Sequence, residues 1–334
     1  MNLLYLLLLT ALAAYVLFGG ADFGGGLLEA TLWRHKRLQE KLQATLAPVW
    51  EANHVWLIAV IVILFVGYPG AYTALTTHFF VPIHLALLAI ILRGAFFTFR
   101  KYDPNPQGGK GLYTLLFRVS SGLAPTVFGL MVGGLLVPLP TLAQAEDLGF
   151  FGMYLQPWLH PIALFCAVFV NALFGYLASV FFWGEVDNAA DRQRIQIRIF
   201  GFFTACFLSG GLVLFSGLLY HLVPPDKILS FIQLEVQVLA LGGIYWMWRA
   251  LQAGKVWQVR FAAGMQTLAI LAGWAHMRYP ALMSFQDGSE ITFASAAAPE
   301  ITRRWLVIGL LIVLSVVLPL LVWLYRVFQK SMES

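Results

Sequence analysis

The chain has 334 residues, of which 60% are hydrophobic and only 11% are charged. About a quarter of the residues of a soluble domain are charged, so this composition excludes an ordinary soluble protein and predicts a polytopic membrane protein. The formal net charge of +5 does not indicate nucleic-acid binding, because in a membrane protein the placement of Lys and Arg is more informative than their sum.

Nine stretches are apolar and long enough to cross a bilayer, which takes about 20 helical residues. Only short loops separate them, so we expect an all-α polytopic membrane protein with a single transmembrane domain over residues 1–334. The number of spans favours two four-helix bundles, in halves 1–138 and 158–277, plus one peripheral last helix. The predicted spans are residues 3–31, 49–68, 78–99, 113–138, 158–183, 196–221, 229–250, 256–277 and 304–326.

The basic residues are unevenly distributed between the predicted loops. Most of them fall in segments that are cytoplasmic if the N-terminus lies outside, whereas the external 139–157 loop carries only Glu146 and Asp147 as charges. The positive-inside rule therefore predicts an external N-terminus and a cytoplasmic C-terminus. The first apolar stretch does not follow a basic region of the kind that begins a signal peptide, and we expect it to remain as a transmembrane helix.

The first span contains a glycine-rich stretch, residues 19–26, that also holds an acid. Glycine lets membrane helices approach closely, which predicts a tight helix contact. Asp22 lies deep in the span, and Glu29 lies on the same helix face seven residues later. An acid at this depth either binds a neighbouring helix or relays protons, and both interpretations stay open for Asp22. For Glu29, nearer the cytoplasmic end, an interfacial role is the stronger expectation.

The second span opens with polar and aromatic side chains in the order Trp50, Glu51, Asn53, His54 and Trp56. On a helix the two tryptophans and the asparagine fall near one stripe, and the acid and the imidazole lie beside it. Ionisable groups inside a membrane segment indicate a functional site by default. This cluster either pins two helices together or carries protons toward a reaction centre.

The third span ends with two arginines seven residues apart, Arg93 and Arg100. We expect Arg100 to be an interfacial anchor. Arg93 lies about two turns deeper, so its guanidinium must reach the interface or find a carboxylate. Arg118 and Glu235 raise the same question in later spans, without a local motif that answers it.

Neither the cysteines nor the histidines predict a metal or haem site in this chain. Cys166 and Cys206 lie far apart and lack metal-ligand spacing. The seven histidines lack the paired four-turn spacing that is typical of membrane cytochromes with two stacked b haems, although a single histidine remains able to serve as an axial ligand. We therefore expect no metal and no directly bound cofactor.

Several motifs together resemble subunit II of the cytochrome bd quinol oxidases, in particular the shorter, cyanide-insensitive-like type. The resemblance rests on residues 20–24, the basic loop 34–37, the motif at 48–57 and residues 93–100, in this order and spacing, and it weakens through the middle spans. It implies a non-haem subunit of a bacterial inner-membrane complex that oxidises quinol and reduces O2 to water. Haems b and d would belong to the partner subunit I, and the isolated chain would not be catalytic.

The resemblance also implies roles for single residues. Asp22 matches the family's acid in the first helix, and Glu51 matches the position where Asp or Glu follows the tryptophan; both are associated with a proton route from the cytoplasm. His54 and Glu29 are further candidates for this route. The candidates for a structural motif are Trp50, Asn53, Trp56, Arg93 and Arg100.

Two departures limit these roles. Ala52 replaces the usual glycine of the motif, and Ser295 stands where an acid often precedes the last helix. The function of that acid in other members is therefore not expected here.

The main alternative function is a proton-coupled secondary transporter. Such a protein has broken helices in corresponding places of its two halves; residues 19–26 suggest one, but the second half shows no counterpart. A haem-binding cytochrome that acts alone and a purely structural scaffold are weaker alternatives. A small single-helix accessory subunit, and a quinone or lipid bound to this chain, also stay open.

Overall fold

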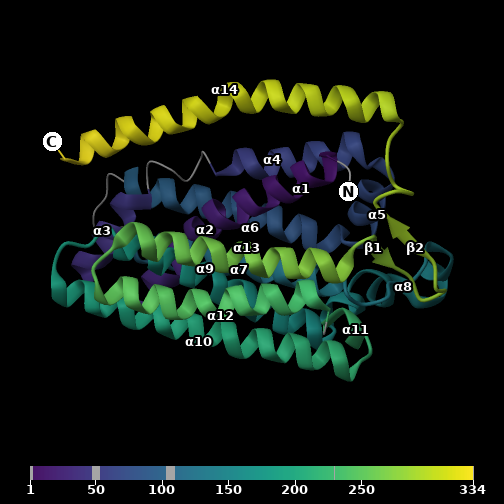
Figure 1. Ribbon diagram of the computed structural model, residues 1–334, viewed down its shortest axis with the longest axis horizontal. Coiled ribbons are helices and arrows are strands. Elements are labelled where there is room, and N and C mark those ends of the chain that lie inside the picture. Colours follow the sequence, from purple (N-terminus) through teal and green to yellow (C-terminus); the bar gives the residue numbers. More distant parts are fainter. Residues whose placement is uncertain (1–2, 47–52, 103–109, 229, 334) are drawn as a thin grey trace.

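The computed structural model describes residues 3–46, 53–102, 110–228 and 230–333, and nearly all of them are helical (Figure 1). The elements in chain order are α1 (Leu3–Ala14), η1 (Tyr15–Gly19), α2 (Gly20–Thr31), α3 (Lys36–Leu46), α4 (His54–Val62), η2 (Ile63–Gly67), α5 (Pro69–His78), α6 (Phe80–Tyr102), α7 (Lys110–Gly134), η3 (Leu142–Gln144), α8 (Ala145–Tyr154), η4 (Gln156–Leu159), α9 (Pro161–Trp183), α10 (Ala189–Leu219), α11 (Pro225–Ile228), α12 (Phe231–Gln252), α13 (Val256–Arg278), β1 (Ala281–Ser284), β2 (Glu290–Thr292) and α14 (Glu300–Glu333).

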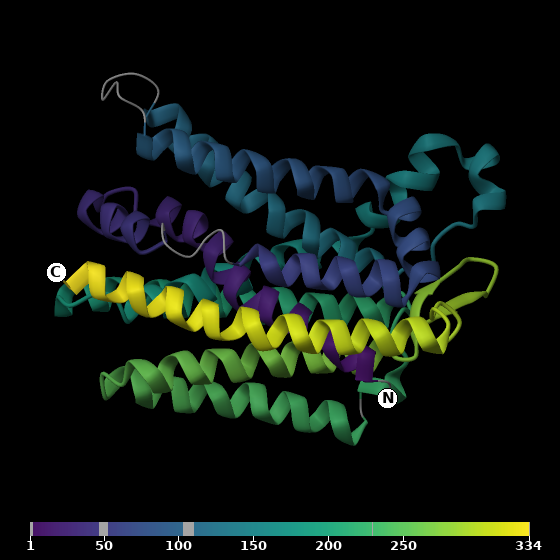
Figure 2. The same ribbon diagram turned by 90° about the horizontal axis from the view of Figure 1, so that it is seen from above.

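The long helices lie side by side, and the short elements gather at the two ends of the bundle (Figures 1 and 2). We call the end with β1 and β2 the hairpin end and the opposite end, with α3, the α3 end. A helix occupies each of the nine predicted spans within the part of the chain that is described. This arrangement agrees with the expected polytopic helical protein, while the division into two four-helix bundles stays a prediction.

The predicted number of nine membrane spans is not confirmed. Among the described residues, six helices are long and apolar enough to cross a membrane, or seven if the bent pair of His54–Gly67 and Pro69–His78 counts as one span. The helices α12 and α13 have sufficient length but are not among these. Both contain glutamines within the helix, such as Gln237 and Gln266, which lower their mean hydropathy.

The bend in the second span has a local cause. Residues 54–67 and 69–78 differ by 115° in direction, with Tyr68 between them in a non-helical conformation. Tyr68 precedes Pro69, and proline disfavours the helical conformation of the residue before it. Pro69 itself suits the first turn of a helix, where a missing N–H costs no hydrogen bond. The second span therefore turns at Tyr68 and continues as α5 across the hairpin end.

Helix α9 is the centre of the packing, in contact with α2, α7 and α10. Glycines permit the closest approaches: a Cβ atom at Gly24 of α2 would lie 1.9 Å from the Phe174 backbone oxygen of α9, and one at Gly129 of α7 would lie 2.4 Å from the Ala167 Cα. These contacts agree with the tight helix contact predicted for residues 19–26. They hold α2 between α7 and α9, and this position sets where the acids of α2 point.

The hairpin end is closed by a small apolar cluster under the two strands. β1 and β2 are antiparallel, with Met283 opposite Ile291, and the buried Met283 packs in one cluster with Leu4, Tyr68 and Leu139. The Leu139 N–H also donates to the Ser284 carbonyl. The segment 279–303 thus packs over the helix ends, and it contains strands that its Ser- and Ala-rich composition does not predict.

Helix α14 lies along one flank of the bundle (Figures 1 and 2). It contacts η2 and α1, while its large apolar side chains, such as Trp305, Ile312 and Trp323, are mostly exposed. An exposed apolar surface of this kind fits lipid or another membrane protein rather than water. The last long helix therefore lies at the flank of this chain, with its apolar side chains outward.

Candidate functional site

The deepest charged pair joins the first and third spans. The Arg93 guanidinium of α6 donates from Nη2 to Asp22 Oδ1 of α2 at 2.7 Å and to the Asp22 backbone carbonyl at 3.0 Å. Both side chains are only 1% exposed. Of the two outcomes predicted for Arg93, reaching the interface or pairing with a carboxylate, the structure therefore has the second.

A second group of charges lies one step nearer the α3 end. Arg100 of α6 donates from Nη1 to both carboxylate oxygens of Glu29, at 3.0 and 2.9 Å. Arg118 of α7 approaches Oε1 of the same carboxylate with Nη2 at 3.0 Å. The Glu29 side chain is fully buried, whereas the Arg118 side chain is 24% exposed, so this guanidinium connects the buried charges with the surface.

These two groups form a ladder because both helices repeat the same spacing. Asp22 and Glu29 are seven residues apart on α2, and Arg93 and Arg100 are seven residues apart on α6. Seven residues are close to two helical turns, so each set falls on one face of its helix. We call the five residues, including Arg118, the charge ladder; it holds three guanidinium groups and two carboxylates.

Aromatic rings fill the space between the arginines. The Phe117 ring of α7 lies 5.4 Å from the Arg93 guanidinium carbon and 4.2 Å from that of Arg100, measured to the ring centroid. The Phe23 ring covers Arg93 from another side at 5.0 Å. Contacts of this kind stabilise a desolvated guanidinium through the ring quadrupole. They keep the two arginines separated and oriented toward their carboxylates.

The ladder changes the expectation for two residues. The sequence predicts an interfacial role for Glu29 and an anchor at the interface for Arg100, but both side chains are buried and paired with each other. The reason is the close packing of α2: a Cβ atom at Gly26 would meet the Ser121 side chain of α7 at 2.4 Å. Because α7 approaches this closely, Glu29 is enclosed and Arg100 turns inward.

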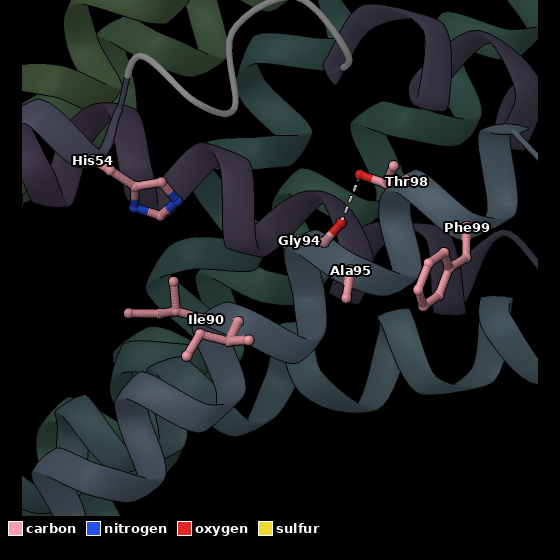
Figure 3. Close-up of a pocket in the computed structure, with 7 residues that line it drawn as sticks. His54, Ile90, Gly94, Ala95, Thr98 and Phe99 are labelled. Atoms are coloured by element: carbon pink, nitrogen blue, oxygen red, sulfur yellow. Dashed lines mark hydrogen bonds between the residues drawn. The ribbon is translucent and has the colours of Figure 1, made fainter.

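His54 lies next to the ladder, at the start of α4. Its ring centroid is 6.5 Å from that of Phe23, the residue that follows Asp22 in α2. On its other side it borders a shallow cavity of about 450 Å³ between α4 and α6 (Figure 3). The cavity is lined by His54, Ile90, Ile91, Gly94, Ala95, Thr98 and Phe99.

This cavity is open and almost wholly apolar apart from His54 and Thr98. The Thr98 hydroxyl is already satisfied, since it donates to the Gly94 carbonyl of its own helix at 3.0 Å (Figure 3). His54 is thus the titratable side chain among the lining residues. Its ring thus borders the groove and also contacts Phe23, the neighbour of Asp22 in the chain.

The other motif residues of the second span pack this span against η1. Asn53 is buried and donates from Nδ2 to the Phe18 carbonyl at 3.3 Å. The Trp56 ring stacks on the Phe18 ring, with centroids 6.5 Å apart. Asn53 and Trp56 therefore hold α4 beside the first span. Trp50 and Glu51 fall in residues 47–52, outside the described residues.

The surface of the α3 end carries further ion pairs outside the ladder. The Lys41 ammonium of α3 donates to Asp187 Oδ2 at 2.8 Å, and this hydrogen bond, followed by the Lys41 charge, lowers the pKa of Asp187 below its ordinary value. Arg37 lies 3.3 Å from Asp191. Leu38 and Leu42 of α3 are buried in the main core, so charges and apolar contacts together fasten α3 to the bundle.

A second cavity, of about 590 Å³, lies at the hairpin end and contains none of the predicted site residues. Within the described ranges, no group of three or more His, Cys, Asp or Glu side chains is arranged to hold a metal ion. Sequence reasoning singled out Arg118 but did not find its partner, Glu29, and it missed the ring of Phe117. The position of Arg118 inside a predicted span was the available signal.

Comparisons with known proteins match this chain over nearly its whole length. A family model described as cytochrome bd terminal oxidase subunit II matches residues 1–328. The chain is 23% identical to cytochrome bd ubiquinol oxidase subunit 2 of Bacillus subtilis (strain 168), over 99% of this chain and 96% of the relative. It is 27% identical to cytochrome bd-I ubiquinol oxidase subunit 2 of Escherichia coli (strain K12), over 49% of this chain and 43% of the relative.

A solved structure shares the fold. The bd oxidase from Geobacillus thermodenitrificans contains a chain that matches this one with a TM-score of 0.75 at 18% identity, over 96% of each chain. At this identity the likeness concerns the fold alone.

Proposed function

The chain belongs to the cytochrome bd terminal oxidase subunit II family, and on this premise we propose that it supports a haem-bearing subunit I and supplies a proton path from the cytoplasm for the reduction of O2 to water. Haems b and d, quinol oxidation and O2 reduction are assigned to subunit I in this proposal. The chain itself contributes no catalytic residue. It takes part in the reaction by delivering protons.

The observation that carries the proposal is the charge ladder, which reaches from the partly exposed Arg118 to the fully buried Asp22. Buried ionised groups in a membrane are costly and mark ion or proton pathways. Guanidinium groups pair with both carboxylates, so charged and hydrogen-bonding groups follow one another from the surface to Asp22. The α3 end is then the cytoplasmic entrance, in agreement with its basic surface.

The two acids differ in their capacity for proton transfer. Both oxygens of Glu29 are engaged by arginines, so this residue serves mainly to hold the electrostatic framework. Asp22 uses one oxygen for Arg93, while its Oδ2 has no hydrogen-bond partner among the described residues. Asp22 is therefore the better proton acceptor of the two.

From Asp22 the proposed path continues to His54 and reaches the groove between α4 and α6 (Figure 3). An imidazole both accepts and donates a proton near neutral pH, and His54 borders the groove on one side and the ladder on the other. Subunit I would receive the protons at this face. Glu51, three residues before His54, is a further member of the path that lies outside the described residues.

The test neutralises the deepest pair without leaving a lone buried charge. In the double variant Asp22→Asn/Arg93→Gln, we expect quinol-dependent O2 consumption by the assembled complex to fall by about tenfold or more, a drop in rate that corresponds to about 1.4 kcal/mol in the barrier. The measurement is oxygen uptake together with proton uptake from the cytoplasmic side in reconstituted vesicles.

The matched control is Glu185→Gln/Arg260→Gln, which neutralises a 2.6 Å ion pair between α13 and the end of α9. This pair lies outside the ladder, so turnover should stay near that of the unaltered complex. Normal turnover in the assembled Asp22 and Arg93 double variant would remove the proton path and leave the ladder a structural role.

The remaining assignments follow from the same premise. Multi-pass membrane insertion agrees with the apolar helices, and we place the complex in the bacterial inner membrane with the N-terminus outside and the C-terminus in the cytoplasm. An accessory single-helix subunit and a quinone or lipid bound to this chain stay predictions. The family match gives no support to a proton-coupled secondary transporter.

A further inference from the structure

Tyr15 has an unusual orientation above the charge ladder. It opens η1, a single π-helical turn between α1 and α2, and its side chain is buried. A Cβ atom at Gly19 would lie 3.0 Å from the Tyr15 Cε2 and 3.6 Å from its Cζ. The ring thus lies over the residue four positions later, although helical side chains normally lean toward the N-terminus.

Asp22 is the next polar side chain of the first span after Gly19. It follows Gly19 by three residues and Tyr15 by seven. Seven residues of helix span about 10 Å along the axis, and the ring, which lies beside Gly19, covers part of that distance. The absence of a side chain at Gly19 leaves the ring this space.

Two buried polar atoms belong to these residues. Tyr15 Oη and Asp22 Oδ2 are both shielded from solvent, and neither has a hydrogen-bond partner among the described residues. Their surroundings are apolar: the Phe128 ring of α7 contacts the Tyr15 ring at 5.9 Å and the Phe23 ring at 6.2 Å. Buried polar atoms in folded proteins are nearly always hydrogen-bonded, to protein or to bound water.

We propose that the Tyr15 hydroxyl and Asp22 Oδ2 are joined through one bound water molecule, which makes Tyr15 a positioning residue for Asp22. The hydroxyl donates to the water, and the water donates to the carboxylate oxygen that Arg93 does not use. A role of this site in proton transfer rests on the proposed function, whereas the hydrogen bond itself does not. A π-helical turn of this kind is frequent at functional sites.

The test uses the whole complex and two readouts. The first is the infrared carboxylate stretching band of Asp22, identified as the band that Asp22→Asn removes; the second is the rate of proton uptake during turnover. In Tyr15→Phe we expect the band to shift, because one hydrogen bond to Oδ2 is lost. We expect proton uptake to slow by about tenfold, the scale of one hydrogen bond to a charged group.

A second variant moves the ring while keeping its hydroxyl. Gly19→Ala places a Cβ at 3.0 Å from the ring, which displaces the phenol, and it should produce the same band shift. The control is Tyr176→Phe, which removes another buried hydroxyl, bonded to Gln266 Oε1, far from Asp22 in the chain and on α9. It should leave both the Asp22 band and proton uptake unchanged.

The outcomes separate the two proposals. An Asp22 band that is unchanged in both Tyr15→Phe and Gly19→Ala overturns the hydrogen bond, whatever happens to proton uptake. A shifted band with normal proton uptake supports the hydrogen bond and contradicts the proton path through Asp22. A shifted band with slowed uptake supports both.

Discussion

Arg93 shows how a single side chain depends on a partner far away in the sequence. Its guanidinium is almost completely buried and bonded to Asp22, 71 residues earlier in the chain. Placing such a charge in a membrane protein is costly unless it is paired and hydrogen-bonded. The pair is therefore a condition for the contact between α2 and α6, in addition to any part in proton transfer.

Removing one member of this pair should destabilise the protein strongly. For Arg93→Ala we expect a loss of about 3–5 kcal/mol in the free energy of unfolding, because Asp22 then remains as an unpaired buried charge. The measurement is thermal unfolding of the purified complex in detergent. Arg260→Ala is the control: this arginine is partly exposed, so its loss should cost much less. Equal losses in both variants would contradict the special role of the buried pair.

The sequence predicted part of this site and could not predict the rest. The depth of Arg93 in an apolar span predicted that its guanidinium reaches the interface or finds a carboxylate. The spans offered more than one acid, and the choice depends on which helices pack together. Arg118 and Phe117 could not be assigned to the site from the sequence for the same reason, because their contacts depend on helix packing. Periodicity places a residue on a helix face, whereas the neighbour of that face is decided by tertiary packing.

At the scale of the elements, glycines determine how close the helices come. Gly24 lets α2 approach the Phe174 backbone of α9, and Gly129 lets α7 approach α9 in the same way. Because α2 is fixed between these helices, both of its acids face the arginines of α6. The predicted glycine contact and the predicted acid site thus depend on the same packing of α2.

An added methyl group at Gly24 should break this packing. In Gly24→Ala the new Cβ would lie 1.9 Å from a backbone oxygen, which a side-chain rotation cannot relieve, so we expect a destabilisation of about 1–3 kcal/mol or more. The yield and thermal midpoint of the assembled complex measure it. Gly201→Ala on α10 is the control, since no atom lies within 4 Å of its Cβ. An unchanged midpoint for Gly24→Ala would show that α2 and α9 are not in this contact.

Element boundaries were predicted with mixed success, and the reasons are local. Long apolar stretches predicted the positions of the long helices, because a bilayer imposes a minimum length. The ends are less exact: α10 begins at Ala189 and not at 196, and α14 ends at Glu333 and not at 326. Pro69 causes the turn at Tyr68, and leucines on one face hold the amphipathic α3. Contacts at the hairpin end hold the short strands β1 and β2. None of these signals appears in an average over 20 residues.

For the whole molecule, the exposed apolar surface of α14 and the groove beside His54 indicate a protein that works in contact with other membrane components. The family match indicates which kind of complex this is, since the relatives are named as subunits of ubiquinol oxidases. In the function proposed above, the haems of such a complex belong to its other subunit.

A visible spectrum tests whether the haems are bound by the partner subunit and not by this chain. In a reduced-minus-oxidised difference spectrum, we expect the isolated chain to be colourless and the complex purified from its own membrane to show bands of b- and d-type haem. The complex should also consume O2 with quinol. Haem bands in the isolated chain would make it a cytochrome in its own right, and a complex without haem would contradict the proposed oxidase.

The equal spacing of the charge ladder has a consequence for folding. A ladder with identical steps permits a slipped alignment, in which α2 moves by seven residues, about 10 Å, and Glu29 pairs with Arg93. Only one of the two pairs survives in that state, since Asp22 then lies beside apolar residues of α6. Two features outside α2 and α6 work against the slip: Arg118 of α7 is in place only for the native position of Glu29, and Phe174 of α9 must meet Gly24. Correct alignment of the first and third spans thus depends on the helices that are inserted after them.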